Sequence, residues 1–232
     1  REGLGYVSVY QYNSGSWSQV GNKIIEPDEE LDAAFGYQVD LSNDGTILAV
    51  GSRTKGDNDE GAAAVFQYSS GTWTQLGSTL TNDNDADEWT RSVALSGNGE
   101  ILAVGSDRHG AGNSTRTGQV RIYALQINGT WEQTTGDDGI EGTSGQRLGR
   151  SVSLSDNGNR VAIGAGLSGN VGRVFVNNTP WNELSNTMAG SNSGGFGIST
   201  TISDDGMRVT FGAVDVYQES SGYVETFQFN GT

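Results

Sequence analysis

The sequence predicts an all-β protein, a β-propeller built from four-stranded antiparallel blades. A tryptophan recurs at intervals of 50 to 58 residues, each time after a short polar turn, at Trp17, Trp73, Trp131 and Trp181. An apolar stretch that ends in Gly-Ser or Gly-Ala recurs at intervals of 48 to 59 residues, at residues 48–52, 102–106, 161–165 and 209–213. No stretch shows a helical period. Repetition at this spacing indicates one supersecondary unit used several times.

Residues 35–77 show the unit in full. Residues 35–41 alternate apolar and polar side chains, as a strand does, and 42–45 (Ser-Asn-Asp-Gly) have the composition of a tight turn. Residues 47–50 form a short apolar strand of the kind that is covered on both faces. After a polar loop, residues 62–68 predict a third strand and residues 73–76 a fourth. Four strands in about 50 residues are typical of a propeller blade.

The same elements recur along the chain in a regular order. The first strand returns at 89–95, 148–154 and 196–202, and the third appears at 6–12, 62–68, 119–125, 173–176 and 223–229. We therefore expect a single propeller region over 1–232, with a partial blade over 1–34, blades over 35–88, 89–146 and 147–193, and a partial blade over 194–232. Because the chain opens and closes on a third strand, we interpret it as part of a larger ring. A small ring closed by strand sharing is the alternative.

The tryptophans are expected to be structural. A large apolar side chain at the same place in every unit predicts packing between neighbouring blades, so Trp17, Trp73, Trp131 and Trp181 should occupy equivalent, largely buried sites. Trp89 stands at the start of a first strand and is also expected in the core.

Composition excludes several classes of partner. The formal net charge is −15, with 28 acidic residues against 13 Lys and Arg. Such a surface repels nucleic acids and anionic membranes, and it favours cations. The chain has no cysteine, so it forms neither disulfides nor thiolate metal sites. No apolar run approaches the roughly 20 residues of a membrane helix.

The first strands carry a family resemblance. Phe35-Gly36 and Phe196-Gly197, together with the Val-Gly-Ser and Ile-Gly-Ala endings, resemble FG-GAP repeats, the blades of integrin-α-type propellers. Trp89-Thr90 departs from the Phe-Gly pair, and the proline of the GAP element is absent. The spacing from Phe66 to Trp73 is similar to kelch repeats, whose double glycine is missing. The chain most resembles FG-GAP-like repeats in secreted proteins of marine microbes.

The acidic run at residues 82–88 is the candidate metal site. Asp83, Asp85 and Asp87 alternate, and Ca²⁺ takes six to eight such oxygen ligands. The calcium loops of FG-GAP repeats lie inside the first hairpin, which is a tight turn here, so the ligands of that family are not transferred. The alternative is a solvated acidic loop without a cation. No other cofactor is expected.

Four Asn-x-Ser/Thr sequons predict sites for N-glycans. They lie in predicted loops or turns, at Asn113, Asn128, Asn177 and Asn230. In a eukaryotic secreted protein Asn113 and Asn128 are the best candidates. Together with the family resemblance, these sequons favour an extracellular or cell-surface location.

No catalytic residues are predicted. The single histidine, His109, lies in a polar loop, and Asp40 is an acid within a strand whose repeat counterparts are Ala94, Ser153 and Thr201. We expect a non-enzymatic extracellular propeller for adhesion, assembly or ligand binding, with a protein, a glycan or a second copy as partner. A carbohydrate-active, glycoside hydrolase-like propeller, with acids around the channel, is one alternative. An intracellular kelch-type scaffold is the other.

Overall fold

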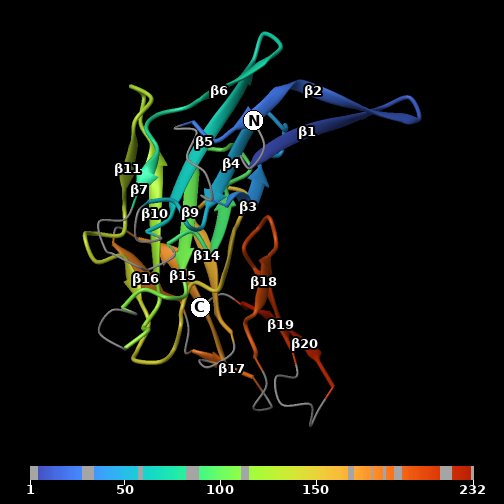
Figure 1. Cartoon of the computed structure of the whole chain (residues 1–232). Coiled ribbons are helices and arrows are strands. Elements are labelled where there is room, and N and C mark those ends of the chain that lie inside the picture. Colours follow the sequence, from blue (N-terminus) through green and yellow to red (C-terminus); the bar gives the residue numbers. More distant parts are fainter. Residues whose placement is uncertain are drawn as a thin grey trace.

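The computed structural model describes ten stretches of the chain, and all its regular elements are strands. It describes residues 5–27, 34–56, 60–81, 89–110, 115–166, 170–178, 180–184, 187–190, 195–214 and 221–230. The strands form antiparallel sheets that lie side by side (Figure 1). The all-β prediction is therefore confirmed. Within the described ranges there is no helix long and apolar enough to cross a bilayer.

Three sheets follow the predicted order, in which each strand pairs with the next. Blade A contains β3 (Phe35–Leu41), β4 (Ile47–Ser52), β5 (Ala62–Ser69) and β6 (Thr72–Gln75). Blade B contains β8 (Ser92–Leu95), β9 (Ile101–Ser106), β10 (Gln119–Leu125) and β11 (Trp131–Gln133). Blade C contains β13 (Ser151–Leu154), β14 (Arg160–Ala165), β15 (Val171–Asn177) and β16 (Trp181–Glu183).

Each of these blades gains a short fifth strand that the sequence interpretation did not include. These strands are β7 (Leu80–Thr81), β12 (Ile140–Glu141) and β17 (Met188–Ala189), and they pair with β5, β10 and β15. The third strand of a blade is longer than the fourth, which covers only its far half. In blade A, for example, β6 pairs with residues 66–69 and β7 with residues 62 and 63. The chain that leaves the fourth strand therefore satisfies the remaining backbone groups.

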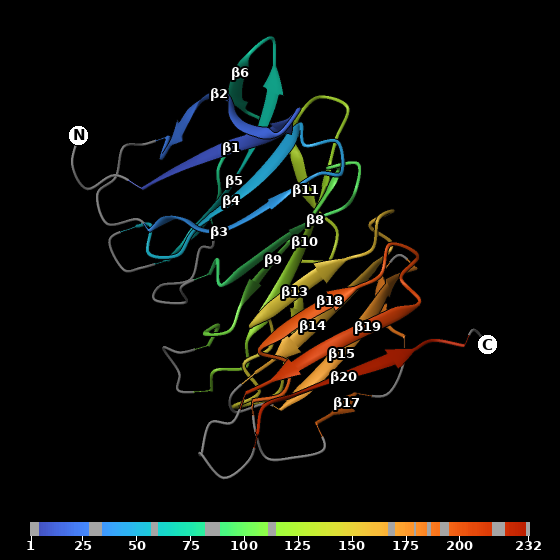
Figure 2. The same cartoon turned by 90° about the vertical axis from the view of Figure 1, so that its right-hand side faces the viewer.

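Two smaller sheets stand at opposite ends of the stack. The N-terminal hairpin consists of β1 (Tyr6–Asn13) and β2 (Ser16–Ile25), and blade D of β18 (Ser199–Ile202), β19 (Arg208–Ala213) and β20 (Tyr223–Gln228). Figure 2 shows the N-terminal hairpin beside blade A at one side of the molecule, blade B next to them, and blades C and D, which overlap in this view, at the other side. The first strands β3, β8, β13 and β18 are neighbours along the inner side. The described strands thus form an open arc of propeller blades.

The first hairpin of every blade is closed by a turn that satisfies its own polar groups. In blade A, the Ser42 hydroxyl donates to Asp44 Oδ1 (2.7 Å) and accepts from the Ile47 N–H (2.9 Å). Asp44 Oδ1 also accepts from the Thr46 N–H, and Gly45 adopts a positive φ that suits glycine. The same bonds recur in the turns that begin at Ser96, Ser155 and Ser203. Serine, Asp or Asn, and glycine are therefore explained here by turn geometry.

These turns also connect neighbouring blades. The Asn43 N–H donates to the Gly97 carbonyl (2.9 Å), the Gly97 N–H to the Asp156 carbonyl (2.8 Å), and the Asp156 N–H to the Asp204 carbonyl (3.0 Å). A row of backbone hydrogen bonds thus ties the four blades together at one end of the first strands.

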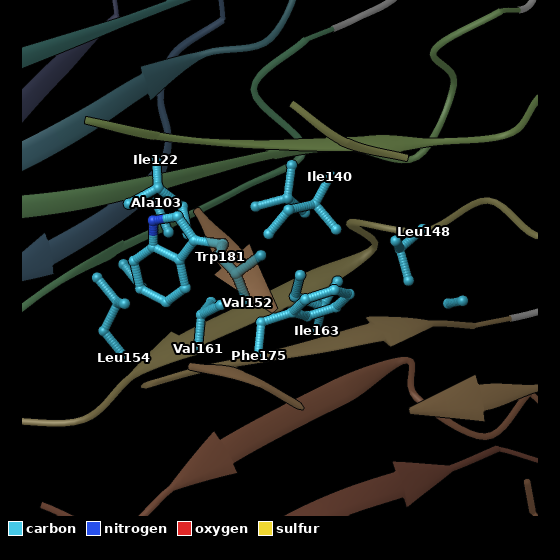
Figure 3. Packing of buried hydrophobic residues seen from close by; sticks show 13 residues of the cluster. Ala103, Ile122, Ile140, Leu148, Val152, Leu154, Val161, Ile163, Phe175 and Trp181 are labelled. Atoms are coloured by element: carbon cyan, nitrogen blue, oxygen red, sulfur yellow. The ribbon is translucent and has the colours of Figure 1, made fainter. Parts of the chain in front are cut away.

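Three of the repeated tryptophans join each blade to the one before it. Trp73 and Trp181 are buried and Trp131 is partly buried. Each indole N–H donates to the residue three positions after the preceding tryptophan: Trp73 to the Val20 carbonyl (2.9 Å), Trp131 to the Leu76 carbonyl (3.0 Å) and Trp181 to the Thr134 hydroxyl (3.1 Å). Figure 3 shows Trp181 among Ile122, Ala103 and Leu154, which belong to two adjacent blades. The predicted packing between blades is confirmed for these residues.

Trp17 is different, and its predicted burial is wrong. The Trp17 side chain lies on β2 and is 69% exposed, beside Tyr12, which is 58% exposed. The N-terminal hairpin stands at the end of the arc, so no preceding blade covers its outer face in the described part of the chain. Trp89 lies just before β8 and is fully buried, as predicted.

Candidate functional site

The first strands place two arginines on the inner side of the arc. Arg91 and Arg150 occupy the same position of the repeat, two residues after the aromatic or Leu that opens the motif. Their backbone N–H groups donate to the carbonyls of Gly105 (2.8 Å) and Gly164 (3.0 Å), which belong to the second strands of their own blades. The corresponding residues of blades A and D are Tyr37 and Ile198. Two neighbouring blades therefore direct a guanidinium group to the same region.

A polar pocket of about 340 Å³ lies where these arginines meet. Its lining residues come from the first strands of all four blades and from the residues just before them: Gln38, Arg91, Ser92, Val93, Arg150, Ser151, Val152, Ile198, Ser199 and Thr200. We call this site the arginine pocket. Its polar groups are guanidinium, hydroxyl and amide groups, and among the described residues the lining contains no carboxylate and no imidazole.

Serine hydroxyls connect neighbouring blades at the arginine pocket. The Ser92 hydroxyl donates to the Gly149 carbonyl and the Ser151 hydroxyl to the Gly197 carbonyl, both at 2.9 Å. Gly149 has a φ of +89°, and a Cβ there would lie 2.6 Å from the Gln119 carbonyl oxygen. Glycine at this place therefore allows the close contact between blades that the serine bonds require.

The arginines of this region share one buried carboxylate. Asp107 is 1% exposed, and its Oδ2 atom pairs with Arg147 Nη2 (2.7 Å) and Arg150 Nη1 (3.3 Å). Two guanidinium groups thus divide a single negative charge. The local charge is positive although the whole chain carries −15.

Arg91 is less compensated than Arg150, which pairs with Asp107. Within the part of the chain that the structure describes, it forms no salt bridge, and it stacks at 5.2 Å from the ring centre of Tyr37, beside Arg53 at 5.1 Å. Burial lowers the pKa of Arg91, the charge of Arg150 lowers it further, and Asp107 acts in the opposite direction. An anion bound beside Arg91 would relieve both unfavourable effects.

Two polar atoms in this region have unused hydrogen-bonding capacity. Thr200 Oγ1 and Arg147 Nε are buried and have no partner among the described residues. Most buried polar atoms in folded proteins are paired, so these two atoms are exceptions in this region.

Asp40 lies on β3, but it does not join a group of acids. Its Oδ2 atom accepts the Leu95 N–H of β8 at 2.7 Å, and its Oδ1 atom accepts the Leu41 N–H at 3.0 Å. Burial raises the pKa of Asp40, and these two hydrogen bonds lower it; neither contribution comes from another carboxylate. The carboxylate therefore connects the first strands of blades A and B.

The predicted metal and glycan sites are only partly within the described residues. Asp83, Asp85, Asp87 and Asn113 lie outside them. Asn128 is exposed in a turn, where its side-chain oxygen accepts from the Thr130 N–H (3.1 Å) and hydroxyl (2.7 Å). Asn230 is exposed after β20, but Asn177 is the last residue of β15, so its predicted place in a loop is wrong. Among described residues no three His, Asp or Glu side chains are grouped to hold a metal.

Two further ionisable residues, His109 and Glu26, each contact an ionisable partner. His109 Nε2 lies 3.0 Å from Glu141 Oε1. Glu26, which the sequence places in an acidic loop, is 1% exposed and pairs at 2.5 Å with Lys55. This buried pair joins the end of β2 to the loop after β4, so Glu26 has a structural role.

Sequence reasoning missed the arginine pocket. The signal was the recurrence of arginine at one repeat position, Arg91 and Arg150, in a chain poor in basic residues. Asp40, an acid that the other repeats do not share, is the more conspicuous residue in the sequence.

Comparison with known proteins now identifies the repeat. Residues 17–66 match the family model of the FG-GAP repeat. Residues 17–66 therefore form an FG-GAP-like repeat. The matched FG-GAP segment runs from Trp17 on β2 to Phe66 on β5 and includes the Phe35-Gly36 pair. The equivalent strands of blades B, C and D extend the same pattern along the chain.

A solved structure supports the propeller architecture. The chain is similar, with a TM-score of 0.56 and 16% identity, to a protein of Bacteroides uniformis provisionally named as a 6-phosphogluconolactonase. The similarity covers 81% of this chain and 49% of that one, so the chain spans about half the length of the structure that it resembles. At this identity the likeness shows the fold alone. No curated protein matches the chain.

Proposed function

We propose that this FG-GAP propeller region is a non-enzymatic ligand-binding module, and that its arginine pocket holds an anionic group of the partner. The observation that carries the proposal is the convergence of Arg91 and Arg150 on one polar pocket, with a single carboxylate between Arg150 and Arg147. Guanidinium groups bind carboxylate, sulfate and phosphate through paired, charge-assisted hydrogen bonds.

The chemistry of the lining favours binding over glycoside hydrolysis. Hydrolysis of a glycosidic bond uses two carboxyl groups about 5–10 Å apart. The arginine pocket is lined by guanidinium, hydroxyl and amide groups, and the nearby Asp40 accepts two backbone hydrogen bonds. These groups hold and orient an anion, but they do not supply a general acid and base.

The net charge limits the kind of ligand. Fields from exposed charges extend about 8–10 Å at physiological salt, so a chain with a net charge of −15 repels an extended polyanion. A short anionic group that enters the pocket is screened from most of these charges. We therefore propose a glycan or protein that presents single carboxylate or sulfate groups.

Titration with simple anions tests the pocket. Sulfate, phosphate and acetate are each exchanged for chloride at constant ionic strength. Each should raise the melting temperature of the wild type, and the anion that binds most tightly should raise it most. Arg91→Gln should weaken the best anion by about tenfold or more, because a hydrogen bond to a charged group contributes about 1.5–3 kcal/mol. Arg208→Gln, which changes an exposed arginine on β19, is the matched control.

The outcome that contradicts the pocket is an equal response of Arg91→Gln and the wild type. Release of sugars from glycans, or hydrolysis of 6-phosphogluconolactone by the purified chain, would overturn the non-enzymatic assignment and favour the enzyme alternatives.

We also propose that the protein is extracellular or displayed at the cell surface, which the FG-GAP repeat and the sequons support. In material from a eukaryotic source, mass spectrometry should find N-glycans at Asn113 or Asn128. Unmodified asparagine at all four sequons would contradict an extracellular location and favour the intracellular kelch-type scaffold.

The calcium site stays a proposal. Millimolar Ca²⁺ should raise the melting temperature if Asp83, Asp85 and Asp87 bind it, and Asp85→Ala should remove that rise. The same rise in Asp85→Ala would place the cation elsewhere.

A further inference from the structure

Every blade contributes a neutral polar side chain to the arginine pocket, at one position of the repeat. The residues are Ser92, Ser151 and Ser199 in blades B, C and D, and Gln38 in blade A, and all four line the pocket. In blades B and C the serine directly follows the pocket arginine. Binding of an anion by the guanidinium groups alone leaves these hydroxyl and amide groups without a role in recognition.

Arginine and serine reach in opposite directions, because successive side chains of an extended segment point to opposite sides. Arg91 stacks on Tyr37 of the preceding blade, whereas the Ser92 hydroxyl donates to the Gly149 carbonyl of the following blade at 2.9 Å. Blade C repeats this arrangement: its arginine pairs with an aspartate of blade B, and its serine donates to a backbone carbonyl of blade D. Guanidinium and hydroxyl groups therefore alternate along the row of first strands.

The two kinds of group differ in what they offer a molecule in the pocket. A guanidinium group only donates hydrogen bonds. A hydroxyl has one proton and two lone pairs, and Ser92 and Ser151 already use their protons on the carbonyls of Gly149 and Gly197. These two serines can therefore only accept a hydrogen bond from a bound molecule. The pocket thus presents donors at its arginines and acceptors beside them.

A simple anion matches only half of this pattern. Sulfate and acetate accept hydrogen bonds from the arginines, but they have no proton to donate to the serine oxygens. A carboxylate on an Asp or Glu side chain of a protein brings no hydroxyl with it either. A sugar ring that carries a negative group matches both halves, because its hydroxyls donate to the serines while the negative group accepts from the arginines.

The volume of the pocket is also larger than a simple anion needs. An anion with four oxygens takes the space of about four water molecules, roughly 120 Å³. The pocket has a volume of about 340 Å³, within the range of about 300–1,000 Å³ that is usual for small-molecule sites. The remaining space suits a ring attached to the anionic group.

We propose that the arginine pocket binds an acidic sugar, in which one ring carries both a negative group and hydroxyls. The negative group, a carboxylate or a sulfate ester, lies at Arg91 and Arg150, and the ring hydroxyls donate to Ser92 and Ser151. This inference rests on the proposed function and narrows it: the partner is a glycan, and the hydroxyls beside its charge contribute to affinity.

Paired ligands separate the contribution of the ring from that of the charge. Glucuronate is compared with acetate, and glucose 6-sulfate with methyl sulfate, by calorimetric titration of the wild type at constant ionic strength. At least one sugar anion should bind about tenfold more tightly than its ring-free counterpart, the effect expected of two additional hydrogen bonds. The sugar anion that binds more tightly identifies the negative group. Neutral glucose should bind at least about tenfold more weakly than that anion, because charge-assisted hydrogen bonds are the stronger ones.

Ser151→Ala tests the hydroxyl contacts. It should weaken the preferred sugar anion by about three- to tenfold, the effect of one hydrogen bond, and leave the ring-free anion within about twofold. A looser contact between blades C and D would weaken both ligands, so the ratio of the two affinities measures recognition of the ring and not a structural role. Ser18→Ala, which removes an exposed hydroxyl on β2, is the matched control and should leave both affinities unchanged.

The outcomes distinguish this inference from the proposed function. If neither sugar anion binds more tightly than its ring-free counterpart, the pocket binds anions without recognising a ring, and the inference alone is overturned. A blocked Gly-Glu-Gly peptide that binds as tightly as the preferred sugar anion would also overturn it and favour a protein partner. If none of these anions binds, the proposed function fails together with the inference. The ligand comparison uses the wild type, so it decides even where a variant does not fold.

Discussion

Asp40 shows how a residue that differs from its repeat counterparts can be structural. Its carboxylate accepts backbone N–H groups of β3 and β8. In blade C, the Ser153 hydroxyl at the same repeat position accepts the Ile202 N–H of β18 at 3.2 Å. Two different side chains therefore perform the same task, which is to satisfy a donor between first strands.

The raised pKa of Asp40 predicts a dependence of stability on pH. The folded chain holds the Asp40 proton more firmly than the unfolded chain, so the contribution of Asp40 to stability increases as the pH falls from 7 towards about 4. The free energy of unfolding of the wild type minus that of Asp40→Asn should therefore increase over this range. Urea denaturation at several pH values measures it.

Asp44 is the matched control for this effect. Hydrogen bonds from the Thr46 N–H, and from Ser42 and Thr46 hydroxyls, lower its pKa, so its contribution is present at neutral pH and is lost as the pH falls. The difference between wild type and Asp44→Asn should change in the opposite direction. The same pH dependence for both variants would contradict this account of Asp40.

The buried pair of Glu26 and Lys55 predicts a large loss when one partner is removed. Lys55→Met leaves the Glu26 carboxylate buried without its cation, which should lower the free energy of unfolding by about 3–5 kcal/mol. Lys23→Met, which removes a lysine from the exposed ring of Tyr6, should lower it by less than about 1 kcal/mol. Equal losses would show that the buried pair has no special role.

At the scale of elements, the fourth strands hold the stack of blades together. Each carries a tryptophan whose ring packs on the preceding blade and whose N–H reaches the residue three positions after the preceding tryptophan. Because the residue pattern is the same in every blade, burial depends on whether a preceding blade is present. Trp73 has one, and Trp17 has none in the described residues.

This difference predicts unequal effects of the same substitution. Trp73→Ala should lower the free energy of unfolding by about 3–5 kcal/mol, the usual loss for a large core side chain. Trp17→Ala should lower it by less than about 1 kcal/mol. Denaturant melting measures both losses. A loss below about 1 kcal/mol for Trp73→Ala would show that the repeated tryptophans do not stabilise the contacts between blades.

At the scale of the whole molecule, the first strands run between ends of different charge. Arg91 and Arg150 stand at one end, and the turns with Asp44, Asp156 and Asp204 stand at the other. The positive end is local, because the chain as a whole is strongly acidic. A short anion can use this end, whereas an extended polyanion meets the remaining negative surface.

Much of the fold could be predicted because the repeat is local information. The first hairpins, their Ser-x-Asp/Asn-Gly turns and the strands that follow depend on alternation and turn chemistry within a few residues. The short strands β7, β12 and β17 could not be predicted in this way, since they form where a long third strand leaves unpaired groups beyond the fourth. The difference in length between the third and fourth strands is known only once the pairing of the strands is known.

The sequence by itself determined the all-β class, the FG-GAP-like repeat, the order of strands in each blade and the absence of thiol chemistry. Tertiary structure decided what each repeated position does. Arg91 and Arg150 line one pocket because adjacent blades bring the starts of their first strands together. Trp17 is exposed while Trp73 is buried because, among the described residues, only Trp73 faces a preceding blade. A residue pattern specifies which side chains a unit presents, but contacts between units depend on their arrangement in space, which the pattern does not contain.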